Sequence, residues 1–193
     1  MSELHKFLFD GLPVRGAVVR LTDAWVEILR RRASNTHTGA YPAPVQNMLG
    51  EMTAAAVLMQ SNIKFDGALV LQIFGDGPVQ VAVVEVQSDL KLRATATVAG
   101  EVAADLSLSQ MVNVNNEGRC AITLDPKTKF PGQQPYQGVV PLFGDSREKI
   151  ENISEVLEHY MLQSEQLDTK LILAADGHVA AGLLIQRLPV KGQ

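Results

Sequence analysis

Residues 44–63 constrain the fold of this chain more than any other segment. Their apolar side chains recur at the three- and four-residue spacing of a helix, and no charged residue lies between Met52 and Met59. A helix that is apolar on every side must be covered on every side, so we expect a buried central helix. Glu51 and Gln60 interrupt the segment, which makes it too short and too polar to span a membrane.

Gly50 is the costly residue of this helix, because a glycine in a helix interior is about 1 kcal/mol less favourable than alanine. We expect another element to pack closely against Gly50 and to offset that cost. Pro42 and Pro44 stand before the helix or in its first turn, where a missing N–H does no harm.

The rest of the chain predicts mainly antiparallel strands around this helix. Residues 69–74 and 79–86 flank the turn Gly75-Asp76-Gly77-Pro78 and predict a hairpin. Residues 5–9 fit a short helix or a strand. Further strands are expected at residues 14–19, 91–98, 112–115, 120–124, 136–140, 170–174 and 179–188, and further helices at residues 22–32 and after the Asp145/Glu148 capping-box pattern. The order predicts the α+β class, with antiparallel sheets packed on a buried central helix in a single domain.

Composition excludes several classes of protein. The 193 residues are 46% hydrophobic and 20% charged, which is typical of a folded globular chain. A net charge of −4 argues against a general nucleic-acid binder, whose affinity depends on a basic face. The beginning of the chain has no signal-peptide pattern, so we expect a cytoplasmic protein that is not bound to a membrane.

The sequence shows no convincing catalytic or metal-binding constellation. His5, His37, His159 and His178 are scattered, and the single cysteine, Cys120, allows neither an internal disulfide nor a cysteine-clustered zinc site. We therefore predict no catalytic residue, no metal ligand and no enzyme.

Three further groups have simpler explanations than chemistry. Cys120 lies in a predicted strand and is interpreted as a small buried hydrophobe. Ser164 near His159 lacks the strand–turn–helix elbow of a nucleophile. The run Arg30-Arg31-Arg32 is interpreted as a solvated helix end that complements the helix dipole, in preference to an anion site.

The first predicted hairpin has apolar side chains on both faces. In its first strand Leu69, Leu71 and Ile73 share one face, and Val70 and Phe74 lie on the other. A sheet that is apolar on both sides is either covered twice by its own chain or binds something on one side. Both alternatives stay open from this pattern.

Seven short runs, in one order along the chain, resemble the N-terminal domain of the heat shock protein 33 family. They are Val14-Arg15-Gly16, Tyr41-Pro42-Ala43-Pro44-Val45-Gln46-Asn47, Lys64-Phe65-Asp66-Gly67, Gly75-Asp76-Gly77-Pro78, Tyr136-Gln137-Gly138-Val139-Val140, Tyr160-Met161-Leu162-Gln163-Ser164-Glu165-Gln166-Leu167-Asp168-Thr169 and Ala181-Gly182-Leu183-Leu184-Ile185-Gln186. The resemblance implies a redox-regulated, ATP-independent holdase chaperone that binds unfolded client proteins under oxidative or heat stress.

The resemblance also implies parts that this chain lacks. The family masks its client-binding surface with a helical linker, binds zinc through four C-terminal cysteines, and dimerises when these are oxidised. Neither cysteine pair is present here, so no cofactor is expected in this chain. We expect a fragment of a longer protein, with a chaperone core at residues 1–187 and the start of the linker at residues 188–193. A homodimer, formed by segment exchange or otherwise, is expected.

We hypothesise that the linker and the clients share a surface formed by Val70, Phe74, Val84 and Val86 of the first hairpin. The family does not assign these residues; the hypothesis rests on the two-sided apolar pattern. Two alternatives from other classes are a small-molecule enzyme with a site around Gly75–Pro78 or Ser164, and a homodimeric assembly module.

Overall fold

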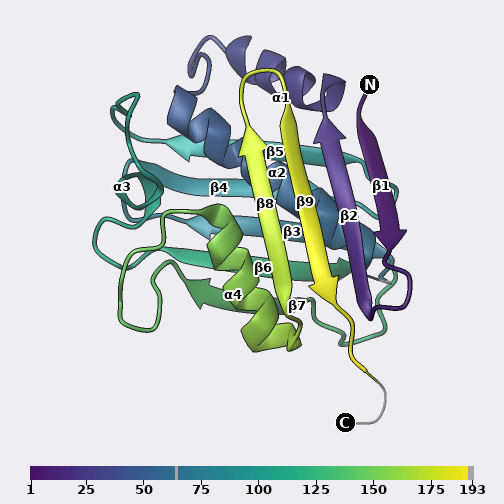
Figure 1. The fold of residues 1–193 in the computed structure, drawn as a ribbon. Coiled ribbons are helices and arrows are strands. Elements are labelled where there is room, and N and C mark those ends of the chain that lie inside the picture. Colours follow the sequence, from purple (N-terminus) through teal and green to yellow (C-terminus); the bar gives the residue numbers. More distant parts are fainter. Residues whose placement is uncertain (64, 191–193) are drawn as a thin grey trace.

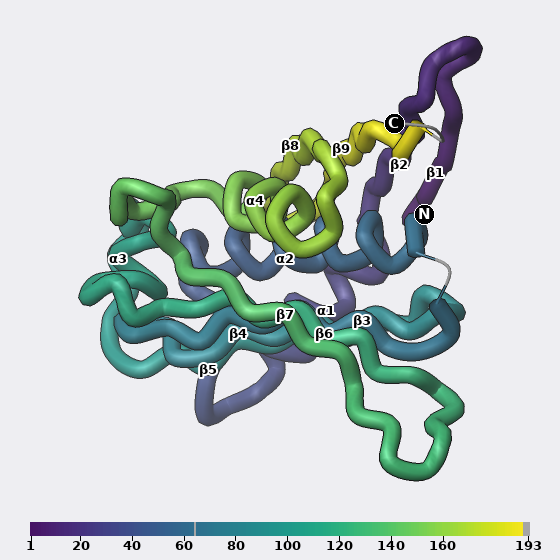
Figure 2. Tube along the Cα trace, turned by 90° about the horizontal axis from the view of Figure 1, so that it is seen from below, coloured from purple at the N-terminus to yellow at the C-terminus, as the bar shows by residue number. Residues whose placement is uncertain are grey.

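Two antiparallel sheets enclose a layer of helices in the computed structural model, which describes residues 1–63 and 65–190 (Figures 1 and 2). The first sheet has the order β1-β2-β9-β8, with β1 (Glu3–Leu8), β2 (Val14–Leu21), β8 (Thr169–Ala175) and β9 (Ala180–Arg187). The second has the order β5-β4-β3-β6-β7, with β3 (Gly67–Phe74), β4 (Val79–Val86), β5 (Leu92–Val98), β6 (Arg119–Pro126) and β7 (Tyr136–Pro141). This arrangement confirms the α+β prediction and resolves residues 3–8 as a strand.

The central helix α2 (Ala43–Asn62) lies between the two sheets (Figure 2). Every residue from Met52 to Gln60 is buried, as the uncharged stretch predicts. The close packing expected at Gly50 is confirmed. A Cβ built on Gly50 would lie 2.5 Å from Cβ of Ala175 and 2.9 Å from Cζ2 of Trp25. The helix is therefore held by its surroundings, since its own sequence is not strongly helix-forming at that point.

Two further helices complete the core. Helix α1 (Asp23–Ala33) buries Trp25, and helix α4 (Ile153–Glu165) lies beside α2 and next to β8 (Figures 1 and 2). Tyr160 of α4 lies over Gly138 of β7, where a Cβ would approach Cε2 of the tyrosine to 2.6 Å. Helix α4 thus lies beside the edge strand β8, on the same side of the second sheet as α2, and leaves the outer side of β8 uncovered (Figures 1 and 2).

Two sequence predictions about element boundaries are wrong. Residues 112–115 are not a strand: Val112 ends a short helix, α3 (Leu108–Val112), and residues 113–115 follow it as a loop. The helix has the capping box of Ser107 and Gln110. Helix α4 begins at Ile153, after Asn152, and not at Asp145. Residues 145–148 form a turn instead, in which the Glu148 carboxylate accepts the N–H of Ser146, so the capping-box pattern serves a turn.

The strand pairings join distant parts of the chain. β2 pairs with β9, so Val18 lies opposite Leu183, and β3 pairs with both β4 and β6. The predicted first hairpin is confirmed, with a register irregularity between Val79 and Val81 in the pairing of β4 with β5. The predicted linker segment, residues 188–193, lies partly outside the described residues. Within the described part of the chain, no helix is both long and apolar enough to cross a membrane.

Candidate client-binding face

The outer face of the four-stranded sheet carries a set of apolar side chains that none of the described helices covers (Figure 1). Strand pairing places His5, Val18, Leu183 and Ile172 in one row across β1, β2, β9 and β8. Residues directly opposite in an antiparallel pair point to the same face, so this row is shared. Phe7 and Ile185 belong to the adjacent row. We call Phe7, Val18, Ile172, Leu183 and Ile185 the outer apolar strip.

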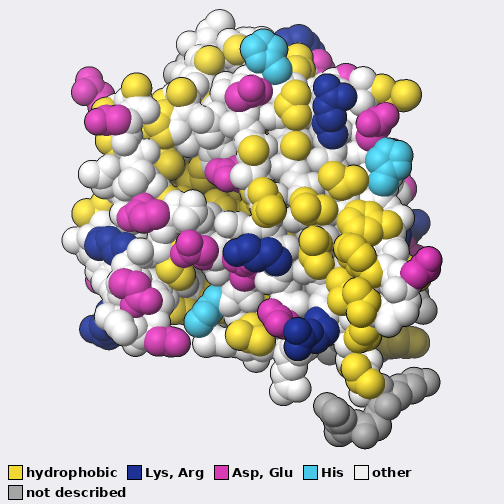
Figure 3. Space-filling model, in the orientation of Figure 1, with side chains coloured by type: hydrophobic (Ala, Val, Ile, Leu, Met, Phe, Trp, Pro, Cys, Tyr) yellow, Lys and Arg dark blue, Asp and Glu magenta, His cyan; other side chains and the backbone are white. Residues whose placement is uncertain are grey.

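Three of these apolar side chains are exposed to solvent, and Leu183 and Ile185 are half-buried. Phe7 is 37% exposed, Val18 39% and Ile172 59%. Figure 3 shows hydrophobic side chains gathered as a band over β2 and β9. A contiguous exposed apolar surface on a folded protein marks an interaction site more often than it marks chance.

Charged side chains border the outer apolar strip without covering it. Two of them lie on the same face as the strip. Arg20 is two residues beyond Val18 in β2, and Lys170 of β8 lies opposite Ile185 of β9. Lys170 approaches the carboxylate of Glu158 to 3.6 Å, in an ion pair whose lysine is exposed and whose carboxylate is largely buried. An apolar centre with a charged, hydrated rim is the usual construction of a polypeptide-binding surface.

The four residues proposed from the sequence do not form one surface. Val84 and Val86 are fully buried in the core, whereas Phe74 is 44% exposed and Val70 is half-buried. The register explains the division: Val84 pairs with Leu71 and Val86 with Leu69, both on the core face, while Val70 pairs with Glu85 on the outer face. The assignment of Val84 and Val86 to an exposed surface is therefore wrong for this structure.

Strand β9 is also apolar on both faces, like the strands of the first hairpin. In β9, Leu183 and Ile185 point outward while Gly182 and Leu184 are buried, so this strand is apolar on both faces. Sequence reasoning could have found this signal. It could not have found Val18 or Phe7, whose contribution depends on the pairing of β2 with both β9 and β1.

The Gly75–Pro78 turn has a structural role. The Asp76 carboxylate accepts the backbone N–H groups of Val114, Asn115 and Glu117 at 2.6, 2.8 and 3.1 Å. Burial alone would raise the pKa of Asp76, but these hydrogen bonds outweigh it and hold the pKa below its usual value. Asp76 thus fastens the segment after α3 to the first hairpin.

The candidate chemical groups do not converge. Among the described residues there is no group of three or more histidine, cysteine or acidic side chains suited to a metal ion. Cys120 is buried, and burial raises the pKa of its thiol to about 12. Ser164 is exposed near the end of α4, and His159 is half-buried on the same helix.

Comparison with known proteins agrees with the fold. The crystal structure of a 33 kDa chaperonin (heat shock protein 33 homolog) from Thermotoga maritima matches with a TM-score of 0.68 at 21% identity, covering 94% of this chain and 59% of that one. The 33 kDa chaperonins of Chromobacterium violaceum and Methylobacillus flagellatus are 47% and 44% identical over 189 residues, each match covering 97% of this chain and 58% of the relative. A family model described as Hsp33 protein matches residues 2–193.

The fold thus defines an α+β protein with two antiparallel sheets around a helical layer, as in the Thermotoga structure. The chain belongs to the Hsp33 family. It spans about 58% of the length of these two curated relatives. The resemblance seen in the seven sequence runs is confirmed.

Proposed function

We propose that this chain is the polypeptide-binding core of an ATP-independent holdase, and that unfolding proteins bind to the outer apolar strip. The observation that carries the proposal is the exposure of that strip: Ile172 and Val18 remain open on a sheet whose other face is the core. The curated relatives are named 33 kDa chaperonin, which supports a chaperone function for the family.

A holdase needs an adaptable apolar surface and no reaction chemistry. Burial of apolar area contributes about 25 cal/mol per Å² and is not directional, so a broad strip suits clients of varied sequence. A strip of this kind needs no nucleotide, since binding is driven by removing apolar surface from water on both partners.

The outer apolar strip replaces the first hairpin as the proposed docking surface for the family's linker. The chain after β9 leaves this sheet at its lower end in Figure 1, where the N–H of Leu188 donates to the carbonyl of Pro13 at 2.7 Å. A segment that follows β9 therefore starts beside the strip. Val70 and Phe74, on the other sheet, stay a secondary proposal.

The family's zinc-based redox switch does not fit the residues of this chain. Four thiolates are needed, and the chain has one cysteine, which is buried and carries a raised pKa. We therefore assign neither zinc binding nor redox sensing to any residue here. We propose that the core binds clients equally under reducing and oxidising conditions.

The test is light scattering from a chemically unfolded client enzyme diluted into buffer without ATP. The purified chain is compared with V18S/I172S, which alters the outer apolar strip, and with F74S/V139S, which alters exposed residues of the other sheet. We expect the unsubstituted chain and F74S/V139S to suppress aggregation, with a thiol reductant and with an oxidant, and V18S/I172S to lose most of the suppression.

Three results would overturn the proposal. One is no suppression by the unsubstituted chain, and another is full suppression by V18S/I172S. The third is loss in F74S/V139S alone, which would return the site to the outer face of the first hairpin. Circular dichroism of each variant shows whether it is folded, and light-scattering mass shows whether the strip is instead a dimer contact.

A further inference from the structure

A pocket of about 530 Å³ lies between α1 and the edge strand β5, on a part of the molecule separate from the outer apolar strip. Its lining includes four cationic side chains, Arg31, Arg32, Lys91 and Arg93, and one carboxylate, that of Glu27. This concentration of positive charge contrasts with the net charge of −4 of the whole chain. A concave surface lined by one sign of charge raises the local concentration of the opposite ion.

Arg32 is fixed in place at the back of this pocket. Its guanidinium lies 4.3 Å from the centre of the Tyr41 ring, and its Nη1 donates to the carbonyl of Ala96 at 3.2 Å. Nε of Arg32 is buried without a hydrogen-bond partner among the described residues. Arg32 is therefore a half-buried cation held by neutral groups, and no carboxylate of the described residues forms an ion pair with it.

The backbone of β5 adds a neutral donor to the same wall. Ala96 turns its N–H outward from the sheet, where it donates to the hydroxyl of Tyr41 at 3.1 Å. The alternation of an antiparallel strand turns the N–H of Ala94 outward in the same way, and Ala94 lines the pocket. A bound anion could accept this N–H together with the guanidinium groups.

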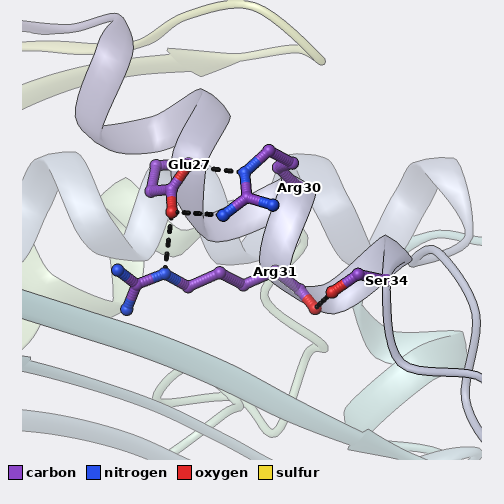
Figure 4. Close-up of polar contacts among 4 residues, drawn as sticks. All are labelled: Glu27, Arg30, Arg31 and Ser34. Carbon is purple, nitrogen blue, oxygen red and sulfur yellow. Dashed lines mark hydrogen bonds and ion pairs between the residues drawn. The ribbon is translucent and has the colours of Figure 1, made fainter.

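The carboxylate at the rim is already engaged. Glu27 accepts Nε and Nη2 of Arg30 and Nε of Arg31, at 2.7 to 2.9 Å, and the terminal nitrogens of Arg31 are directed away from it (Figure 4). Hydrogen bonds from Arg30 and then from Arg31 lower the pKa of Glu27 to about 2, so it stays ionised and paired. Arg31 thus keeps donors free for a second anion.

Lys91 and Arg93 also have carboxylate partners, but these lie outside the pocket. Asp89 is 3.4 Å from Lys91, and Glu85 is 2.6 Å from Arg93. Both cations are more than 80% exposed in their side chains, but their partners differ: Asp89 is 55% exposed and Glu85 only 19%. The exposed pair of Lys91 with Asp89 contributes little energy. An incoming anion of higher charge can therefore recruit Lys91, together with the donors of Arg93 other than the Nε and Nη2 that bond Glu85.

We propose that this pocket binds a phosphate-bearing small molecule. Guanidinium groups match the oxygens of a phosphate in a bidentate fashion, and a multiply charged anion gains from several cations at once. Ile28, Leu90 and Leu92 form an apolar wall of the same pocket, against which the organic part of a phosphate ester can lie. The ligand chemistry is the phosphate group, from an inorganic polyphosphate or from an ester.

The experiment titrates inorganic pyrophosphate, phenyl phosphate and sulfate into the purified chain by calorimetry at matched ionic strength. Backbone amide shifts of Ala94 and Tyr41, followed by NMR, report where each anion binds. R31Q/K91Q removes two exposed cations of the pocket, and K127Q/K129Q removes two exposed cations from the β6–β7 connection, so the two variants have equal net charge.

We expect saturable binding of pyrophosphate or phenyl phosphate, with shifts at Ala94 and Tyr41. Binding should weaken at least about tenfold in R31Q/K91Q, and by less than about twofold in K127Q/K129Q, because charge-assisted hydrogen bonds are lost only in the first. Tighter binding of phenyl phosphate would identify an ester as the ligand, and tighter binding of pyrophosphate an inorganic polyphosphate. Non-saturable binding, equal weakening in both variants, or equally tight sulfate binding would overturn the proposal.

Discussion

The indole Nε1 of Trp25 donates a 2.8 Å hydrogen bond to the backbone carbonyl of Asp176, which is 151 residues further along the chain. This bond ties α1 to the turn between β8 and β9. The same indole packs against Gly50 of α2, and Trp25 is completely buried. One side chain therefore joins the first helix, the central helix and the last hairpin.

Substitution of Gly50 by alanine should destabilise the protein by about 1–3 kcal/mol, although alanine is the better helix former. The new methyl group would lie 2.5 Å from Cβ of Ala175 and 2.9 Å from the indole, and both neighbours are held by other contacts. Urea unfolding measures the loss. Gly177→Ala is the control, because a Cβ built on Gly177 meets no atom closer than 3.6 Å. A G50A protein more stable than the unsubstituted one would show that Trp25 and Ala175 can move away from residue 50.

Replacing Val84 by serine should cost about 3 kcal/mol of unfolding free energy, because it leaves a cavity and buries a hydroxyl. Ile172→Ser should change stability by less than about 0.5 kcal/mol, since Ile172 is 59% exposed. Thermal unfolding of the two variants distinguishes core from surface. If V84S unfolds at the same temperature as the unsubstituted protein, Val84 is not a core residue, and its assignment to the client-binding surface would be restored.

Glu51 should make stability depend on pH. Burial raises the pKa of its carboxyl from 4.5 to about 7 in the folded protein. The folded state then binds more protons than the unfolded state between these values, so the unfolding free energy falls as pH rises from 4.5 to about 7. Because the group is partly solvated, we expect a loss of about 1 kcal/mol.

Urea unfolding below pH 4.5 and above pH 7 tests this expectation. Glu51→Gln should remove that part of the slope and raise stability at the higher pH. Glu101→Gln, at an exposed position, serves as the control. An unchanged slope in E51Q would show that Glu51 is ionised throughout.

Asp76→Asn should destabilise the segment after α3 by about 2 kcal/mol, because a charged acceptor of three backbone N–H groups is replaced by a neutral one. The pKa of Asp76 is lowered in the folded state, so its contribution is present above the unfolded value of 3.8 and is lost as pH falls through the folded value. Hydrogen exchange at Val114 and Asn115 is the measurement. Equal protection in D76N and in Asp10→Asn would contradict the role.

Cys120 should be inert toward thiol reagents in the folded protein. Its pKa of about 12, raised by burial, leaves almost no thiolate near neutral pH, and the side chain is 2% exposed. Labelling by a chromogenic disulfide should therefore follow global unfolding and become fast in concentrated urea. Rapid labelling without denaturant would show that Cys120 is accessible and would reopen a redox role for it.

Much of the fold is readable in the sequence because it depends on local patterns. The uncharged run from Met52 to Met59 predicts a buried helix, and the turn residues 75–78 predict the first hairpin. The start of α4 is misplaced for a local reason too: a capping pattern at Asp145 and Glu148 also suits a turn. Local sequence patterns therefore predict which helices and strands form better than they predict the residues at which these begin and end.

The candidate site depends on pairings that no local pattern contains. Val84 and Val70 both lie in strands that are apolar on two faces, and only the register shows that one faces the core and the other the solvent. The pocket around Arg32 likewise needs Tyr41 and Ala96, which come from separate segments. The sequence run Arg30-Arg31-Arg32 is solvated at its first two members, as predicted, but its third member is half-buried.

The sequence alone determined that a buried helix is combined with antiparallel strands, that the chain belongs to the Hsp33 family, and that it has no cysteine cluster. Periodicity, short motifs and residue counts carry these results, and all three are properties of the chain itself. The tertiary structure decided which apolar face stays open. That choice follows from long-range packing: β2 lies between β1 and β9, and α4 packs beside the edge strand β8 and not over the outer face of that sheet. Side chains such as Val18 and Ile172 become one surface only after these pairings form.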